Sequence, residues 1–274
     1  QFQGGARVRI SGHVEKERGK VCEDFNGLLF YRLYDNKSTI TTRANTGGEP
    51  FVYNDWNKEI NNGSDSIANG RFSTTLIIPK DINYSNENGR LVFYAVADNN
   101  RIEANGSSEN FLVGGYSQDA ITDTIGPEIF MYLNDRDFTD GDIVNNTPIF
   151  AAELHDESGI QYNGYGIGHD LQLCIDGDPK KTFNLNSFYS QNRGDHSRGN
   201  VYFAEIPALE DGAHWLSFRA WDMMNNTSQK TIKFVVGKDL EPELLTLMLE
   251  SDVVSGHTNF HIGYNFPGLE CDFT

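Results

Sequence analysis

The hydrophobic positions along the chain mostly recur at every second residue, the periodicity of a β-strand with one buried face. Clusters of Gly, Asn, Asp and Ser separate these runs, and they are the residues that turns require. The run at 91–97 is apolar on both faces, as expected for a central sandwich strand. Helical periodicity is scarce. The pattern predicts an all-β protein, with its clearest strands at 6–10, 28–34, 72–78 and 91–97.

Two parts of the chain repeat one pattern. The string Tyr-Ala-Val-Ala-Asp at 94–98 precedes Phe-Leu-Val-Gly at 111–114, and Phe-Arg-Ala-Trp-Asp at 218–222 precedes Phe-Val-Val-Gly at 234–237. A strand, a turn rich in Asp and Asn, and a closing strand form the last hairpin of an immunoglobulin-like (Ig-like) sandwich. The repeat therefore predicts two consecutive Ig-like β-sandwiches.

The domain boundaries follow from this repeat. We expect the first sandwich at 1–117 and the second at 126–238, joined by a polar, glycine-rich linker. Residues 239–274 contain two more alternating runs and are interpreted as the truncated start of a third β module. The chain is therefore expected to be a piece of a longer protein, and its first ten residues lack the apolar core of a signal peptide.

Composition narrows the function classes. The chain has 274 residues, which favours about two domains. Lys plus Arg number 22 and Asp plus Glu number 39, so the formal charge is −17. This charge repels phosphate backbones and anionic lipids and disfavours nucleic-acid or membrane-surface binding. The sequence also has no apolar run long enough to span a bilayer.

Catalysis within this chain is not expected. Cys22, Cys174 and Cys271 are odd in number and far apart, which fits neither a disulfide framework nor a zinc pair. Nucleophile elbows, His-Glu-x-x-His helices and glycine-rich phosphate loops are absent from the sequence. One catalytic hypothesis stays open: a latent hydrolase that uses a pair of carboxylates, since carboxylates are plentiful. No spacing in the sequence marks such a pair.

An acidic loop is the best candidate for metal binding. Four carboxylates within eight residues, with Gly141 to allow a tight bend, suit a hard cation such as Ca²⁺. The spacing departs from an EF-hand by one residue, and Arg136 supplies an internal counter-charge, so a solvated hairpin loop is the alternative. The candidate ligands are Asp135, Asp137, Asp140 and Asp142.

Histidines and aromatic residues offer weaker signals. His155 and His169 each lie beside a carboxylate and either ligate metal or cap a turn. Several aromatic residues near turns either stack on sugars or belong to the core. These aromatic residues are Tyr162, Tyr165, Phe188, Tyr189 and Tyr202.

A set of short strings resembles one family. They are Asp-Phe-Asn-Gly at 24–27, His-Asp-Glu-Ser-Gly-Ile at 155–160, Gly-Tyr-Gly-Ile-Gly-His-Asp at 164–170, Leu-Asn-Ser-Phe-Tyr at 185–189, Leu-Glu-Asp-Gly-Ala-His at 209–214 and Ala-Trp-Asp-Met-Met-Asn-Asn at 220–226. Together they resemble the β-sandwich region after the peptidase domain in PorU-type sortases, the gingipain-related cysteine peptidases of type IX secretion. The family landmarks, with no chemical role attached, are Asp156, Gly159, Gly168, His169, Asp170, Trp221 and Asp222.

The resemblance implies a location on the extracellular face of a Gram-negative outer membrane. Members of the family cleave a C-terminal signal from secreted cargo and couple the new end to anionic lipopolysaccharide. Their catalytic Cys and His lie in a caspase-like domain, which would lie upstream of this chain, so no catalytic residue carries over. The chain is therefore expected to be a non-catalytic spacer and docking module of such a peptidase.

The expected partners are other secretion-system proteins or cargo at the outer membrane. The alternative is a Ca²⁺-assisted carbohydrate-binding module of a surface protein, with a glycan as the partner. This second hypothesis draws on the acidic loop and the aromatic residues near turns, because calcium can bridge carboxylates and sugar hydroxyls.

Overall fold

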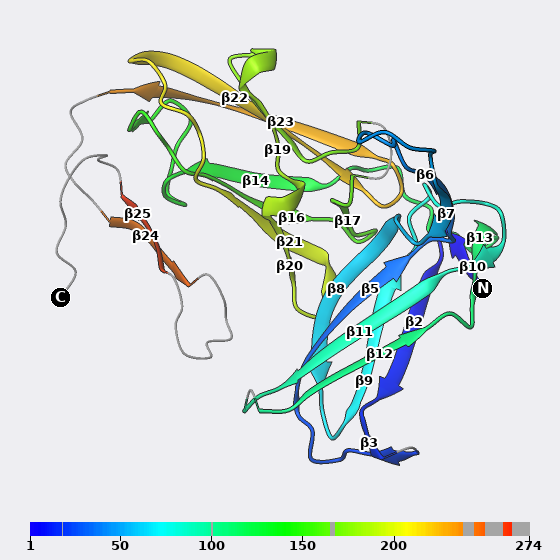
Figure 1. The fold of residues 1–274 in the computed structure, drawn as a ribbon. Helices are drawn as coiled ribbons and strands as arrows, with labels where there is room; N and C mark the ends of the chain where they lie inside the picture. The colour runs from blue at the N-terminus through cyan, green and yellow to red at the C-terminus, as the bar shows by residue number, and fades with distance from the viewer. Residues whose placement is uncertain (18, 100, 165–167, 238–243, 250–259, 265–274) are drawn as a thin grey trace.

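Strands make up nearly all of the regular structure in this computed structural model (Figure 1). It describes residues 1–274 except 18, 100, 165–167, 238–243, 250–259 and 265–274. Two single-turn 3-10 helices, η1 (Pro179–Lys181) and η2 (Asn186–Phe188), interrupt the strands. None of the helices in these ranges is long and apolar enough to cross a membrane. The predicted fold class is confirmed: an all-β chain with two consecutive sandwiches followed by a β-hairpin.

The first sandwich packs a four-stranded sheet against a two-stranded one. The larger sheet has the order β12-β11-β5-β8, and the smaller sheet pairs β2 with β9. Alternating residues of both sheets point inward and form the buried core, which includes Leu29, Leu33, Ile60, Leu76 and Leu91. The strands are β2 (Arg7–His13), β5 (Gly27–Tyr34), β8 (Glu59–Ile67), β9 (Arg71–Ile77), β11 (Arg90–Ala97) and β12 (Glu103–Ser108).

Shorter strands complete the first sandwich. Strand β13 (Leu112–Tyr116) pairs in parallel with β1 (Phe2–Gly4) and antiparallel with β10 (Glu87–Asn88). Val113 on β13 is fully buried in the core, so this small sheet helps to cover it. Two hairpins project from the sandwich: β3 (Glu15–Glu17) with β4 (Lys20–Val21), and β6 (Ser38–Thr41) with β7 (Val52–Asp55).

The second sandwich also has two sheets. One has the order β14-β16-β21-β20, and the other has the order β15-β23-β22-β18-β19, with β17 also paired to β22. Phe150 and Phe218 face each other across the core with ring centroids 5.2 Å apart. The strands are β14 (Glu128–Leu133), β15 (Ile143–Val144), β16 (Phe150–His155), β17 (Ile160–Gln161), β18 (Gln172–Ile175), β19 (Thr182–Asn184), β20 (Tyr189–Asn192), β21 (Asp195–Phe203), β22 (Gly212–Asp222) and β23 (Thr227–Val236).

The repeated sequence pattern corresponds to related hairpins. Strand β22 turns directly into β23, which ends in parallel pairing with β15. In the first sandwich β11 turns into β12, and the chain then moves to β13, which pairs in parallel with β1. The second closing strand is therefore continuous, whereas the first is divided between two sheets. After the second sandwich, β24 (Leu244–Leu249) and β25 (Phe260–Tyr264) form an antiparallel hairpin, as the alternating runs predict.

The two sandwiches meet at the turn between β22 and β23. Met223 and Met224 are buried there against Ile77 of β9, with Ile121 of the connecting segment packed beside them. The backbone and the Nζ of Lys80 donate hydrogen bonds to the carbonyl groups of Met223 and Met224, at 3.1 and 2.9 Å. Apolar packing and directional hydrogen bonds therefore hold the two sandwiches in one relative orientation.

Candidate functional site

The site begins at a tight turn after β16. Asp156 follows the last residue of this strand, and its Oδ1 accepts the backbone N–H of Ser158 at 2.7 Å. The backbone N–H of Gly159 donates to the carbonyl of Asp156. Gly159 has a φ of +83°, a conformation that side chains with a Cβ rarely adopt. The string Asp-Glu-Ser-Gly is thus the sequence that this turn requires, and it holds the Asp156 carboxylate toward the junction.

A second turn, after β22, positions Asp222. Its Oδ1 accepts the backbone N–H groups of Met224 and Asn226 at 2.9 and 2.7 Å, and its Oδ2 accepts Asn226 Nδ2 at 2.7 Å. Asn225 lies at a φ of +69°, which Asn tolerates better than most residues. Asp222 therefore organises the same turn that packs on the first sandwich.

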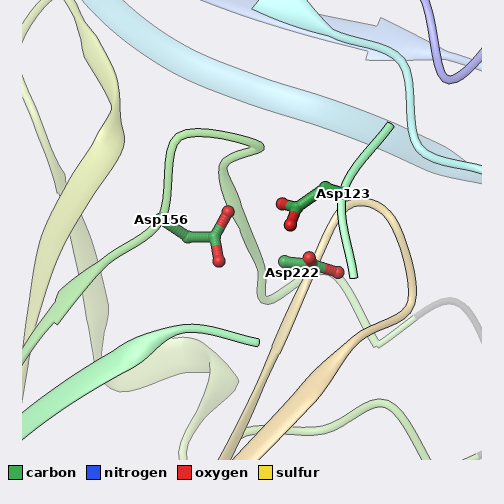
Figure 2. Close-up of side chains that lie close together, drawn as sticks. All are labelled: Asp123, Asp156 and Asp222. Carbon is green, nitrogen blue, oxygen red and sulfur yellow. The ribbon is translucent and has the colours of Figure 1, made fainter. Parts of the chain in front are cut away.

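The segment between the sandwiches supplies the third carboxylate. Asp123 accepts the backbone N–H of Ile125 at 3.0 Å, and its Oδ2 accepts a short hydrogen bond from Ser158 Oγ. One oxygen from each of Asp123, Asp156 and Asp222 lies within 4.8 Å of the others. Figure 2 shows the three carboxylates turned toward a common space from three separate segments. We call this group the junction triad.

Burial makes the junction triad electrostatically unusual. Asp156 is 7% exposed and Asp222 is 0% exposed. Burial, together with the neighbouring carboxylates, raises the pKa of Asp156 to about 7. Burial also raises the pKa of Asp222, against its hydrogen bonds from Asn226 and Met224. Burial acts in the same direction on Asp123, but hydrogen bonds from Ser158 and from the Ile125 and Thr124 amides outweigh it and lower its pKa.

A cation or a proton is needed to balance this cluster. Among the described residues, none of the three carboxylates forms an ion pair with Lys, Arg or His. Unpaired buried charges are costly, so two or three ionised carboxylates at this separation attract a positive species. The junction triad could therefore hold a metal ion, with the three carboxylate oxygens as ligands.

The acidic loop proposed from sequence is arranged differently. Asp140 Oδ1 accepts the backbone N–H of Lys233, and Asp142 Oδ2 accepts that of Thr139. Asp135 Oδ1 likewise accepts the N–H of Asp137. Within the described ranges, the only group of three or more metal-type ligands that meets is the junction triad. Ca²⁺ binding by Asp135, Asp137, Asp140 and Asp142 stays a prediction, and these contacts show three of the four carboxylates accepting backbone amides.

The remaining landmark residues surround the junction. His169 stacks on Trp221 with ring centroids 4.1 Å apart, and its Nδ1 lies 2.9 Å from Asp81 Oδ2 of the first sandwich. Asp81 Oδ1 accepts Asn225 Nδ2, so the two contacts connect both sandwiches. Asp170 accepts Asn186 Nδ2 at 2.8 Å, and the Gly168 carbonyl accepts Arg219. The structure thus assigns these landmark residues packing and hydrogen-bonding roles.

His155 and His169 are not brought together as ligands of one cluster in the described part of the chain. The Nδ1 of His155 lies 3.4 Å from Glu128, and its Nε2 lies 3.5 Å from Glu157. Cys22 and Cys174 are free thiols. Burial and a hydrogen bond to Asp24 raise the pKa of Cys22, which disfavours the reactive thiolate. Cys271 lies outside the described residues.

A groove runs along the seam between the two sandwiches. It has a volume of about 710 Å³ and is lined by Phe30, Arg32, Asn62, Tyr94, Tyr162 and Gln191 among others. Phe30 and Tyr94 are neighbours on paired strands, 42% and 40% exposed, with ring centroids 6.3 Å apart. We call this the junction groove.

The aromatic residues singled out from sequence fall into different environments. Tyr162 and Tyr189 line the junction groove and pack against each other with ring centroids 4.5 Å apart and the ring planes tilted by 34°. Tyr162 Oη donates to Asn62 Oδ1 at 2.6 Å across the domain boundary. Phe188 packs edge-on against Phe203 of the core. Tyr202 lies on β21 and Tyr165 lies outside the described residues. Phe30 and Tyr94, the exposed pair, were missed because alternation alone does not tell which face of a strand is covered.

Asp123 was also missed by sequence reasoning. It lies in a polar connecting segment with no local motif around it, and only its contact with Ser158 places it near Asp156. The one signal for it was the proximity of this acidic residue to the predicted boundary between the two sandwiches. Acidic residues are too common in linkers for that to indicate a site.

The fold and junction define a class: tandem Ig-like β-sandwiches locked at a carboxylate-rich turn. The chain is similar to dimeric latent PorU from Porphyromonas gingivalis, at 33% identity and a TM-score of 0.55 over 97% of this chain and 25% of that chain. It thus spans about a quarter of that chain. A complex of Dpr2 Ig1-Ig2 with DIP-Theta Ig1-Ig3 is 8% identical over 86% of this chain and 60% of that chain, with a TM-score of 0.22, too low to support an argument. No family model and no curated protein matches the chain.

Proposed function

We propose that this chain forms non-catalytic accessory modules of an exported cysteine peptidase of the sortase type, which processes type IX secretion cargo at the outer membrane. The observation that carries the proposal is the 33% identity to PorU along 97% of this chain. In this proposal the catalytic domain lies outside the chain, and the two sandwiches set its distance and orientation relative to partners. Their mechanism is geometric, because loops on a rigid scaffold present contact residues.

The junction supports a rigid rather than a flexible spacer. Asp81 contacts both His169 and Asn225 of the second sandwich, at 2.9 Å each. Tyr162 donates to Asn62, and burial raises the pKa of this tyrosine, which keeps it a neutral donor. These contacts add to the apolar packing of Met223 and Met224. Bending between the sandwiches would have to break several of them together.

We infer further that the cation of the junction triad is Ca²⁺. Carboxylate oxygens are hard ligands that suit Ca²⁺, whereas structural zinc sites are built from Cys and His ligands, which this cluster lacks. Asp123 belongs to the connecting segment, while Asp156 and Asp222 belong to the second sandwich. A bound ion would therefore fasten the connection to the second sandwich. Calorimetry that detects no Ca²⁺ binding at neutral pH would overturn this assignment.

The docking role is tested with purified components. In a pull-down, the immobilised 274-residue chain should retain the separately purified peptidase domain or a secretion-system component. A Lys80→Ala/Asp81→Ala variant should retain the same partner at least several-fold less well. The reason is that Lys80 and Asp81 fix the angle between the sandwiches. Lys16→Ala/Asp24→Ala removes an exposed ion pair away from the junction and serves as the matched control. Retention of partners by the peptidase domain alone would show that the docking role is wrong.

A second candidate function is glycan binding at the junction groove. The exposed Phe30 and Tyr94 rings can stack on a sugar ring, and Asn62 and Gln191 supply neutral hydrogen-bonding groups beside them. The chain's charge of −17 favours a neutral over an anionic glycan. This observation, rather than the acidic loop, is what favours the carbohydrate hypothesis.

Glycan arrays probed with and without Ca²⁺ test this candidate. A Phe30→Ala/Tyr94→Ala variant should lose binding by about tenfold or more, since each stacked ring contributes about 1 kcal/mol or more. Phe51→Ala/Tyr53→Ala removes another exposed aromatic pair, 6.0 Å apart, that lies outside the groove, and it should leave binding unchanged. Arrays that stay silent in both conditions would exclude glycan binding.

A further inference from the structure

The two sheets of the first sandwich differ in width. Four strands, β12-β11-β5-β8, face only two, β2 and β9. A cavity of about 710 Å³ opens between the outer strands β2 and β12, where the smaller sheet ends before the larger one does. We call this cavity the edge slot. Its lining includes Leu29, Leu91 and Ala95, which belong to the buried core.

Small residues leave the floor of the edge slot unfilled. The inward-facing positions of β12 are Ala104, Gly106 and Ser108, which pair with Ala95, Phe93 and Leu91 of β11. Phe93 points toward the core but is only half-buried, as is Phe72 of β9. A Cβ added at Gly106 would meet no atom within 4 Å. The sandwich therefore has an apolar surface that its own side chains do not cover.

Both walls of the edge slot are free strand edges. Among the described strands, β2 pairs only with β9, and β12 pairs only with β11. The carbonyl of Ala6 accepts a hydrogen bond from the Ile78 N–H, and the N–H of Val14 donates to the Gly70 carbonyl. The backbone N–H and C=O groups of even-numbered residues in β2 therefore point toward β9. Bonded positions alternate along an antiparallel strand, so the backbone groups of Arg9 and Ser11 point into the slot. A free edge of this kind is a template for another strand.

Charge along this edge is opposite to that of the whole chain. Arg7 and Arg9 of β2 and Arg71 of β9 project from the outer face of the two-stranded sheet, where all three are exposed. None of these three guanidinium groups forms an ion pair with a described carboxylate. Glu15, just beyond β2, also lines the slot, but its carboxylate lies 2.8 Å from His13 Nε2. In a chain of net charge −17, the part of the β2 edge at Arg7 and Arg9 is thus locally basic.

We propose that the edge slot binds an extended segment of a partner protein, as a third strand beside β2. Alternate side chains of that segment are apolar and fill the space over Gly106 and Phe93. The side chains between them are acidic and lie beside Arg7 and Arg9, since same-face neighbours on paired strands are about 5 Å apart. Strand addition of this kind takes its affinity from backbone hydrogen bonds and its selectivity from the alternate side chains. The inference uses the geometry of the first sandwich alone and does not rest on the proposed parent peptidase.

Synthetic peptides and the complete chain provide the test. The probe is a peptide of about nine residues, the upper range of strand lengths, that alternates Val with Glu. A matched peptide alternates Val with Lys. Calorimetry should show saturable binding of the Glu peptide that weakens with added salt, and binding of the Lys peptide should be at least tenfold weaker. Equal or tighter binding of the Lys peptide, or no binding of the Glu peptide, overturns the proposal.

Two variants locate the binding site. Gly106→Val places a side chain in the open space of the slot and should reduce peptide affinity at least tenfold. Ser107 also borders the slot, but side chains alternate along a strand, so its side chain projects from the face of β12 opposite to that of Gly106. Ser107→Val should therefore bind the peptide as the unmodified chain does. Thermal melting shows that both variants fold. If Gly106→Val binds as tightly as Ser107→Val, the peptide is bound elsewhere and the proposal is wrong.

A further experiment tests whether the segment that binds in the edge slot comes from a second copy of this chain. Light scattering without peptide should show no dimer that depends on the β2 edge. Ser11→Pro blocks that edge and leaves the backbone hydrogen bonds to β9 in place, because the Ser11 N–H faces the slot. It also removes the exposed Ser11 Oγ–Ser73 Oγ contact. A dimer that Ser11→Pro abolishes would identify the occupant as another copy and overturn the proposal of a partner segment.

Discussion

Replacing Asp222 with alanine is expected to lower the free energy of unfolding by about 3–5 kcal/mol, because three donors lose their buried acceptor and each unsatisfied buried group costs roughly 1–3 kcal/mol. The carboxylate is fully buried and accepts hydrogen bonds from the Met224 and Asn226 amides and from the Asn226 side chain. Its loss leaves these donors without a partner in the turn that holds Met223 and Met224 against the first sandwich. Urea unfolding followed by tryptophan fluorescence measures the change.

The matched control is Asp98→Ala. Asp98 follows β11 at the position that Asp222 occupies in the repeated sequence pattern, but it is exposed. An exposed replacement of this kind is expected to change stability by less than about 0.5 kcal/mol. If the two variants lose equally little stability, the Asp222 turn does not hold the junction together.

The stability of the metal-free protein is expected to fall as pH rises from about 4 to about 7. The folded-state pKa of Asp156 is about 7. Its unfolded value is about 3.9, so folding favours the protonated form. This contribution is fully present below pH 4 and is lost as pH rises through 7, with a slope of at most about 1.4 kcal/mol per pH unit. Thermal melting in the presence of a chelator measures it. An Asp156→Asn variant, which carries no titrating proton there, should melt with a flatter pH profile.

Calcium should reverse this trend. The ion binds deprotonated carboxylates, so at pH 7 and above it replaces the lost proton as the balancing charge. Saturating Ca²⁺ at a hundred times its dissociation constant would add about 2.7 kcal/mol to the unfolding free energy. The Asp222→Asn variant should show little of this gain. We infer that a proton on Asp156 or a bound Ca²⁺ balances the buried carboxylates of the triad. This inference is wrong if Asp156→Asn melts with the same pH profile as the unmodified chain, or if Ca²⁺ leaves the melting temperature unchanged.

The sequence predicted those parts of the fold that alternate. The runs at 6–10 and 91–97 lie largely within β2 and all within β11, because one or both faces are buried and apolar side chains must recur there. Strand β8 escaped the pattern. Its sequence, Glu-Ile-Asn-Asn-Gly-Ser-Asp-Ser-Ile, is mostly polar, and one of its asparagines, Asn61, is buried and donates to the Ile77 carbonyl. Hydrogen bonds to neighbouring backbone hold such a strand, and they have no periodic signature.

The candidate site likewise depends on contacts that leave no periodic signal in the sequence. Sequence reasoning weighted the density of carboxylates and chose the loop at 135–142, where most of the carboxylates accept backbone amides. The junction triad instead gathers one carboxylate from each of three distant segments. Asp156 and Asp222 were recognised only as shared landmarks, because their strings encode turns. Long-range packing brings these two turns together and places Asp123 beside them.

The parallel pairing of β1 with β13 has a mechanical consequence. These strands lie near the beginning and end of the first sandwich, and Phe2 lies opposite Val113. Tension applied along the chain pulls the start of one strand and the end of the other in opposite directions, so it loads their hydrogen bonds in shear. Bonds loaded in shear must break together, whereas a hairpin pulled from one end opens one bond at a time. The first sandwich would thus resist stretching along the chain.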